Sequence, residues 1–356
     1  MRSTTLATKT SRTSPVSLEF HVPPALSAHE PPEARGIARD QVRMLVGRRE
    51  DGRLSNHRFA DLPDVLTPGD VLVVNTSATI PAAIDALGRP DLVVHVSTEL
   101  PDGTWVVELR RRVAGGATEP YAGGIADDRF TIAGGAHVHL RRPYTRGRLW
   151  VAEIDAPSVP SYLMVHGRPI RYSYVDRDWP LSAYRSVFAV TPGSAEMPSA
   201  SRPFTDELVT RLVSRGIVFA PILLHTGVAS PEAHEKPYPE RFSVPDTTAR
   251  LVNEARAAGH RIIGVGTTAV RAIETAADER GRLRAAAGWT SLVVTPDRGV
   301  RAIDGLVTGF HEPQASHLDM LKAIAGEPLV AACYAEALRR GYLWHEFGDI
   351  NLLLDR

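Results

Sequence analysis

The stretch of the chain best suited to binding a ligand lies at residues 261–271. It reads R-I-I-G-V-G-T-T-A-V-R, an apolar run broken by two glycines and followed by two threonines and an arginine. The spacing predicts a strand, a turn and the start of a helix, where free backbone N–H groups and hydroxyls favour a polar or anionic ligand group. The pattern is neither a Walker loop nor the dinucleotide fingerprint, so by itself it favours an ordinary capped helix.

Four titratable residues are candidates for proton transfer, and each lies at the end of a predicted strand or in the loop that follows one. They are His225, Glu240, His311 and Asp349. Ligands of open α/β sheets bind at that edge. Taken singly, each residue is more often structural, as a hydrogen-bonded loop histidine or an aspartate in a turn. Their joint position beside the glycine-rich turn indicates general acid–base chemistry as the alternative.

Other site chemistries are disfavoured by the residue types present. The thirteen histidines form no H-E-x-x-H pattern, and the single cysteine, Cys333, cannot build a thiolate site. No metal is therefore predicted. No G-x-S-x-G elbow is present for nucleophilic catalysis, and Cys333 lies on an apolar helical pattern that favours an inert core thiol.

The candidate residues lie on alternating strand and helix patterns. These patterns predict an α/β main domain with a mixed sheet, formed by residues 19–81 and 161–356. Residues 82–160 show short strand-like runs separated by glycine pairs and no long helix, which predicts an inserted small all-β barrel. Residues 1–18 are polar and contain no apolar stretch, and we expect a flexible tail there. Residues 182–190 are predicted to be helical.

A linker at residues 160–180 is rich in aromatic and arginine side chains. They are Tyr162, Arg168, Arg171, Tyr172, Tyr174, Arg177 and Trp179. Such side chains stack on nucleic-acid bases, but they also pack at the contact between two domains, and the sequence favours neither interpretation.

The amino-acid composition limits the kinds of partner that the protein is expected to bind. The chain has 41 Lys and Arg and 41 Asp and Glu, so no global basic field indicates nucleic acid, and only a local patch would contact it. No apolar run reaches membrane-spanning length, so no membrane partner is expected. One cysteine fits a reducing compartment, and we expect a cytoplasmic protein. The sequence makes no prediction of oligomeric state.

Several motifs occur in a fixed order along the chain. They are Arg39-Asp40 before a strand, H-x-F-x-D-L-P…GD…N at 57–75, G-V-G-T-T-A-V-R at 264–271, D-G-L…F-H-x-P at 304–313 and F-G-D at 347–349. Together they resemble the S-adenosylmethionine:tRNA ribosyltransferase-isomerase family of queuosine biosynthesis. The likeness covers nearly the whole chain beyond residue 18.

The resemblance implies an α/β domain with an inserted β-barrel and an unusual reaction of S-adenosylmethionine. The family transfers the ribosyl part of this co-substrate to the aminomethyl arm of a deazaguanine base in tRNA, forming epoxyqueuosine and releasing adenine and methionine. No other cofactor is expected, and tRNA is the expected partner. The sulfonium acidifies the ribose 5′ carbon, so the site needs a general base and a pocket that excludes water.

The resemblance also suggests roles for individual residues. Three are predicted to be catalytic, through proton transfer or positioning: Glu240, His225 and His311. Eight are predicted to bind substrate or border the site: Gly266, Thr267, Thr268, Arg271, Asn75, Arg39, Asp40 and Asp349.

The chain departs from the family pattern in several loops that would face one site. The family's N-D-T-R-V-I-P-A-R becomes N-T-S-A-T-I-P-A-A at 75–83, a glycine and a histidine are lost at 197–205, and a lysine is replaced by Gln314. Loss of arginine and lysine weakens phosphate contacts. Two alternatives therefore stay open: an enzyme on the same scaffold that acts on a small-molecule acceptor, and a non-catalytic ligand-binding homologue.

Overall fold

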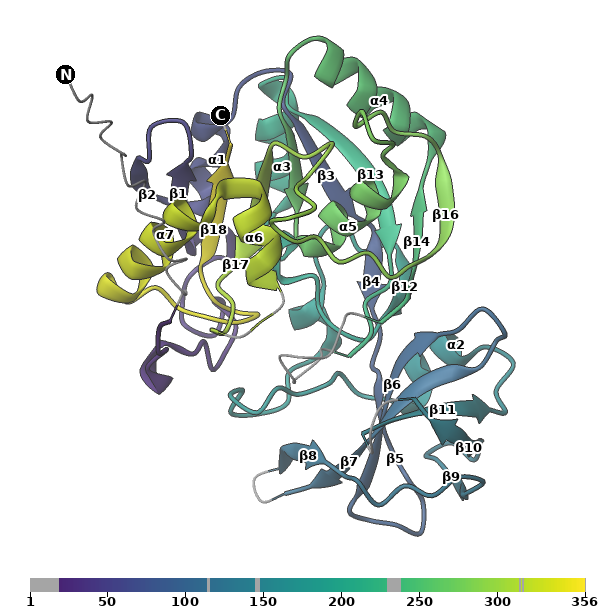
Figure 1. Cartoon of the computed structure of the whole chain (residues 1–356). Coiled ribbons are helices and arrows are strands. Elements are labelled where there is room, and N and C mark those ends of the chain that lie inside the picture. Colours follow the sequence, from purple (N-terminus) through teal and green to yellow (C-terminus); the bar gives the residue numbers. More distant parts are fainter. Residues whose placement is uncertain are drawn as a thin grey trace, which may run out of the picture.

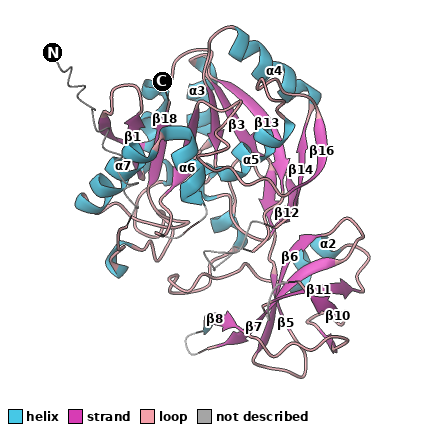
Figure 2. Cartoon of the chain, viewed as in Figure 1, coloured by secondary structure: helices cyan, strands magenta, loops and turns pink. Residues whose placement is uncertain are grey.

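The computed structural model describes residues 19–113, 116–144, 148–228, 238–313, 315 and 317–355. The predicted tail at residues 1–18 lies outside this part of the chain. The described residues form a larger body of strands and helices and a smaller body made mostly of strands (Figures 1 and 2). None of the described helices is long and apolar enough to cross a membrane.

The larger body is built on a sheet of nine strands in the order β16-β14-β13-β3-β15-β17-β18-β1-β2. The strands are β1 (Arg43–Arg48), β2 (Leu54–Arg58), β3 (Val71–Asn75), β13 (Val218–Leu224), β14 (Glu240–Val244), β15 (Ile262–Val265), β16 (Ala286–Thr290), β17 (Gly305–Gly309) and β18 (Ile350–Leu354). The pairs from β13 through β3 and β15 to β17 are parallel, whereas β18 runs antiparallel to β17. The predicted mixed-sheet α/β class is confirmed.

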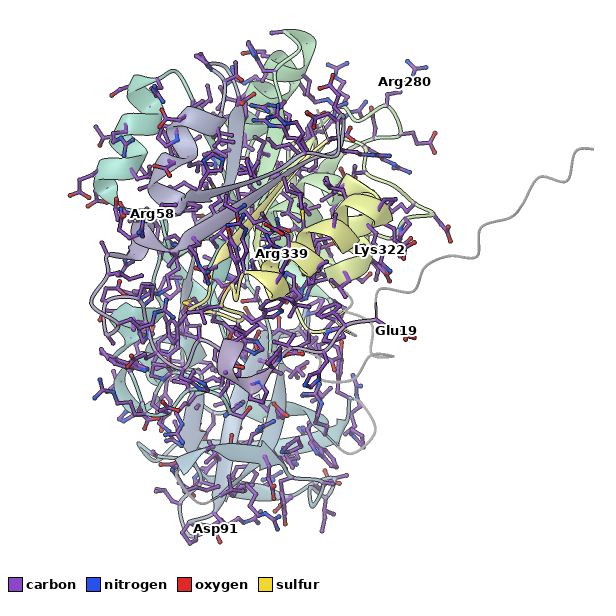
Figure 3. The ribbon with its side chains drawn as sticks, turned by 90° about the vertical axis from the view of Figure 1, so that its left-hand side faces the viewer. Glu19, Arg58, Asp91, Arg280, Lys322 and Arg339 are labelled. Carbon is purple, nitrogen blue, oxygen red and sulfur yellow. The ribbon has the colours of Figure 1, made fainter. Side chains whose placement is uncertain are left out.

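Helices cover both faces of this sheet. They are α1 (Leu62–Val65), α3 (Asp206–Ser214), α4 (Asp246–Ala257), α5 (Thr267–Ala276), α6 (His317–Ala325) and α7 (Glu327–Arg339). The side chains of β3 alternate between the two faces of the sheet. Val71 and Val73 belong to the core formed with α4 to α7, and Leu72 and Val74 belong to the core formed with α1 and α3. This alternation follows from the two-residue period of a strand. The side chains of Lys322 and Arg339 belong to α6 and α7 (Figure 3).

The smaller body is a seven-stranded antiparallel sheet in the order β5-β6-β7-β11-β10-β9, with β8 paired to β7. Its strands are β5 (Ala83–Asp85), β6 (Leu92–Glu99), β7 (Trp105–Arg112), β8 (Thr118–Pro120), β9 (Arg129–Thr131), β10 (His137–Pro143) and β11 (Leu149–Ile154). A bridge between Ala86 and Ile132 joins its two ends, with Leu87 N donating to Thr131 O at 2.7 Å. The predicted β-barrel is thus confirmed.

Two elements near the junction of the bodies differ from the predictions. Helix α2 (Val159–His166) adds Val159 and Leu163 to the barrel core, so we propose that the inserted unit continues past residue 160. The predicted helix at 182–190 is wrong, because only a 3-10 turn forms at Leu181–Tyr184. The chain then makes a turn at residues 187–188, where the Phe188 ring packs against Phe204 and Phe219.

The chain enters and leaves the barrel beside a short two-stranded sheet. Strand β4 (Ser77–Thr79) precedes the barrel, and β12 (Thr191–Ser194) follows it. The two strands pair in parallel, with Thr191 opposite Ser77. This pairing holds the entry and exit segments together next to the carboxyl ends of β3 and β13.

Candidate active site

A cavity of about 430 Å³ lies at the edge of the large sheet where β13, β15 and β17 end. Since these strands are parallel, their carboxyl ends meet at one edge, which is where open α/β sheets bind ligands. Segments from both halves of the sheet line the cavity: 196–200, 226–228, 265–268, 292–294, 308–312 and 345–346, together with single residues between them. The volume suits a small-molecule ligand.

The start of α5 forms one wall of the cavity. Gly266 joins β15 to this helix with φ +88°, a left-handed conformation that favours glycine, and its N–H donates to Val307 O at 2.8 Å. No side chain in the described part of the chain caps the helix, and its first N–H groups have no partner within the helix and carry the positive end of the helix dipole. Thr267 and Thr268 add hydroxyl groups to this wall.

Glu240 and Arg271 form an ion pair that lines the cavity. Arg271 Nη1 donates to Glu240 Oε2, and Gly227 N donates to Glu240 Oε1 at 2.9 Å. The same guanidinium donates from Nε to Leu292 O at 3.1 Å and from Nη2 to Thr290 O at 3.2 Å. Arg271 therefore fixes the Glu240 carboxylate and joins α5 to the segments beside it, so its donors are engaged within the protein.

His311 follows the end of β17 and lines the cavity. Thr308 Oγ1 lies 2.9 Å from His311 Nε2, and the ring of His317 stacks on it with centroids 4.7 Å apart. Loss of hydration, with smaller contributions from His317 and His345, lowers the pKa of His311 well below its usual value. The imidazole is consequently neutral near pH 7.

Two predicted site residues form the layer directly behind the cavity lining. Asn75 Nδ2 donates to Leu224 O at 2.8 Å and to Thr268 Oγ1 at 3.2 Å, so it connects β3, β13 and the start of α5. His225 Nδ1 lies 2.8 Å from Ser77 Oγ, and loss of hydration lowers the pKa of His225 to about 4. Asn75 thus holds Thr268, which lines the cavity, and His225 directly precedes the lining residue Thr226.

Three further predicted residues lie outside the cavity lining. Asp349 accepts hydrogen bonds from Arg43 N at 2.8 Å and from Leu343 N at 2.7 Å, and it pairs with the Arg43 guanidinium. Arg39 donates to Glu33 Oε1 at 3.0 Å, and Asp40 Oδ1 accepts from its neighbour Gln41 at 3.3 Å. The structure thus brings together six predicted residues at the cavity: Glu240, His311, Gly266, Thr267, Thr268 and Arg271.

Several cavity residues were missed by sequence reasoning. They are Glu196, Glu312, His317, His345 and Glu346. Loss of hydration lowers the pKa values of His317 and His345 to about 4 and raises that of Glu346 to about 7. The only sequence signal for Glu346 is its position next to the F-G-D motif, because no spacing pattern distinguishes it from a surface glutamate.

The lining carries more negative than positive groups. Among the described lining residues four are glutamates and one is an arginine, Arg271, which is already paired with Glu240. Apolar side chains complete the wall, among them Val265, Phe310 and Met320. No cluster of three or more metal-ligating side chains occurs among the described residues. The arrangement suits a cationic ligand held away from bulk water.

Comparison with known proteins defines the family. The model of a family described as queuosine biosynthesis protein matches residues 16–353. The chain belongs to this family. It is 36% identical to the S-adenosylmethionine:tRNA ribosyltransferase-isomerase of Acidiphilium cryptum, with 94% of this chain and 97% of that protein covered. The protein of the same name from Moorella thermoacetica is 34% identical, with 94% and 98% covered.

A solved structure also matches this chain. The crystal structure of S-adenosylmethionine tRNA ribosyltransferase from Thermotoga maritima superposes with a TM-score of 0.54 at 28% sequence identity. The match covers 95% of this chain and all of that chain. The resemblance found in the sequence motifs is therefore confirmed at the level of both sequence and fold.

Proposed function

We propose that this protein is an S-adenosylmethionine:tRNA ribosyltransferase-isomerase, which transfers the ribosyl moiety of S-adenosylmethionine to a deazaguanine base in tRNA. The observation that carries the proposal is the family match across residues 16–353, in a chain whose cavity of about 430 Å³ lies at the ligand-binding edge of the sheet. S-adenosylmethionine serves as co-substrate, and we propose no further cofactor. Action on tRNA implies a cytoplasmic protein.

The start of α5 is the proposed receptor for the carboxylate of S-adenosylmethionine. Free N–H groups and the dipole at a helix start favour an anionic group, and Thr267 and Thr268 add hydroxyl donors. Gly266 leaves the backbone open for close approach, since a Cβ there would lie 3.6 Å from Ala200 Cβ and 3.7 Å from Thr268 Oγ1. The rest of the co-substrate then extends across the cavity toward His311.

His311 is the proposed general base. It removes the proton from the ribose 5′ carbon, which the adjacent sulfonium acidifies, and the sugar ring opens as the carbon–nitrogen bond to adenine breaks. Ring opening leaves a double bond between C4′ and C5′ beside the sulfonium and an aldehyde at C1′, and the departing adenine takes up a proton. The acceptor amine adds to C4′ and loses a proton, and the C5′ electron pair bonds to the aldehyde carbon C1′. The alkoxide formed on C1′ then closes the epoxide on C5′ as the carbon–sulfur bond breaks and methionine leaves with its electron pair. Apolar neighbours such as Phe310 and Met320 exclude water that would quench the carbanion. Glu240, fixed by Arg271, positions the ribose hydroxyls.

The proposal is tested by following the ribose itself. The purified protein is incubated with tRNA that carries the aminomethyl deazaguanine and with S-adenosylmethionine labelled in the ribose, and the tRNA nucleosides are analysed by mass spectrometry. We expect the labelled five-carbon unit on the modified base, and none when tRNA is omitted. A parallel incubation contains the free aminomethyl deazaguanine base, and label on this base but never on tRNA would support the small-molecule alternative instead. Binding of S-adenosylmethionine without any labelled product would support a non-catalytic homologue.

A further inference from the structure

One carboxyl group in the cavity wall has an oxygen without a partner. Glu346 lies in the loop before β18, and its Oε2 atom is shielded from solvent and has no hydrogen-bond partner among the described residues. A buried acceptor that lacks a donor costs roughly 1–3 kcal/mol, and more when it is charged. The proposed mechanism does not use Glu346, so it does not explain why the fold keeps a buried oxygen without a hydrogen-bond donor.

The loop around Glu346 is held rigidly. Trp344 and Phe347, on either side of it, are buried, and Asp349 N donates to Leu343 O at 2.8 Å. His345 adopts φ +73°, an unfavourable conformation for a non-glycine residue, which persists only where the surroundings enforce it. Strain of this kind is typical of ligand sites, and here it lies directly beside the unpartnered carboxyl group.

The polar surroundings of Glu346 favour a cation. The lining described above holds four glutamates and one arginine, whose charge Glu240 already neutralises. Loss of hydration raises the pKa of Glu346 to about 7, and its charge contributes to raising the pKa of buried Tyr172. A ligand that brings both an N–H donor and a positive charge satisfies the unpartnered oxygen and offsets the excess of carboxylates.

We infer that Glu346 is the receptor for a protonated primary amine of a substrate, accepting its N–H at Oε2 and pairing with its charge. This inference rests on the proposed function, whose two substrates each carry such an amine. One is the α-amino group of S-adenosylmethionine, and the other is the aminomethyl arm of the deazaguanine base. Both are ammonium groups near pH 7, so the chemistry recognised is the same.

The test uses Glu346→Gln, which keeps the size and one acceptor oxygen but removes the charge. Calorimetric titration measures the binding of S-adenosylmethionine, of its analogue without the α-amine, and of the free aminomethyl deazaguanine base. We expect a loss of roughly tenfold to a hundredfold in affinity for the amine that Glu346 holds, because hydrogen bonds to charged groups are the strong ones. Glu254→Gln, on the exposed surface of α4, is the matched control and should change none of these affinities.

The three ligands identify the source of the amine. A loss confined to S-adenosylmethionine, with the deaminated analogue unaffected, assigns the α-amino group. A loss confined to the free base assigns the aminomethyl arm. Unchanged affinity for both amines overturns the inference. These titrations require no turnover, so they remain informative if the ribose-labelling experiment contradicts the proposed function.

Thermal stability separates ligand binding from a structural role. Replacing an unpartnered, shielded carboxyl group by an amide should leave the midpoint of unfolding of the ligand-free protein unchanged or raise it. A residue that braces the loop would instead lower the midpoint when replaced. A clearly lower midpoint combined with equal losses for all three ligands would therefore overturn the inference as well.

Discussion

Arg271 shows how a residue chosen as a ligand contact acquires a different role once its partners are known. Its guanidinium donates to Glu240 and to the carbonyl groups of Leu292 and Thr290, all within the protein. We therefore assign Arg271 to positioning Glu240, with the start of α5 left to contact the ligand. A sequence predicts the types of residue at a site, but the direction of a long side chain is decided by partners remote in the chain.

Replacing Arg271 tests this assignment. Arg271→Ala leaves the largely buried Glu240 carboxylate unpaired, so we expect a loss of about 3 kcal/mol in unfolding free energy together with loss of turnover. The double variant Arg271→Met with Glu240→Gln removes both charges and should recover most of the stability without recovering turnover. Chemical denaturation and the ribose-transfer assay measure the two effects. Full turnover in the double variant would contradict the role given to this pair.

His311 is expected to act as a neutral base. Its pKa lies well below the usual value, so the neutral form persists as the pH falls through 6.5, and kcat/KM should stay level between about pH 6 and 8. His311→Asn should lower kcat by roughly a hundredfold to ten-thousandfold while S-adenosylmethionine still binds. Steady-state kinetics and calorimetry provide the measurements. An unchanged kcat in His311→Asn would argue against His311 as the base, and a fall in kcat/KM centred near pH 6.5 would contradict its lowered pKa.

At the scale of elements, the turn between β15 and α5 depends on a glycine. Gly266 has φ +88°, so Gly266→Ala should destabilise the fold by about 1–3 kcal/mol and displace the helix start that faces the ligand. Gly52, with φ +68° in the turn between β1 and β2, provides the control, since a Cβ there meets no atom within 4 Å. Gly52→Ala should cost stability but leave the affinity for S-adenosylmethionine unchanged, whereas Gly266→Ala should weaken it. Equal affinities of both variants for S-adenosylmethionine would contradict the binding of this ligand at the start of α5.

Most elements could be predicted because local patterns dictate them. The apolar run and the glycine break at 261–266 predict strand β15 and the start of helix α5. The apolar runs separated by glycines between residues 82 and 160 predict the strands of the barrel. The prediction of a helix at 182–190 was wrong because the long-range packing of Phe188 against Phe204 outweighs the local helix propensity. Glu346 could not be foreseen, because its special state arises from tertiary burial of one oxygen rather than from any spacing.

At the scale of the whole molecule, several histidines stay neutral in the folded state. Loss of hydration lowers the pKa values of His225, His317 and His345 to about 4 and that of His95 to about 3. The unfolded chain binds protons at these groups below pH 6.5 while the folded chain does not. Stability is therefore fully present above pH 6.5 and is lost as the pH falls toward 4, by up to about 1.4 kcal/mol per unit for each histidine.

The pKa of His311 is lowered as well, whereas the raised pKa of Glu346 acts in the opposite direction, so one group opposes five histidines. We accordingly expect the midpoint of thermal unfolding, followed by circular dichroism, to be clearly lower at pH 5 than at pH 7. An unchanged or higher midpoint at pH 5 would show that these histidines are hydrated in solution and would contradict the closed packing around the cavity.

The products released from S-adenosylmethionine show most directly which part of it the protein transfers. The measurement is chromatographic quantification of adenine, methionine and S-adenosylhomocysteine after incubation with S-adenosylmethionine and tRNA that carries the deazaguanine base. We predict adenine and methionine in equal amounts, matched to the modified tRNA formed and absent without tRNA. Formation of S-adenosylhomocysteine in their place would mean methyl transfer and would contradict the account.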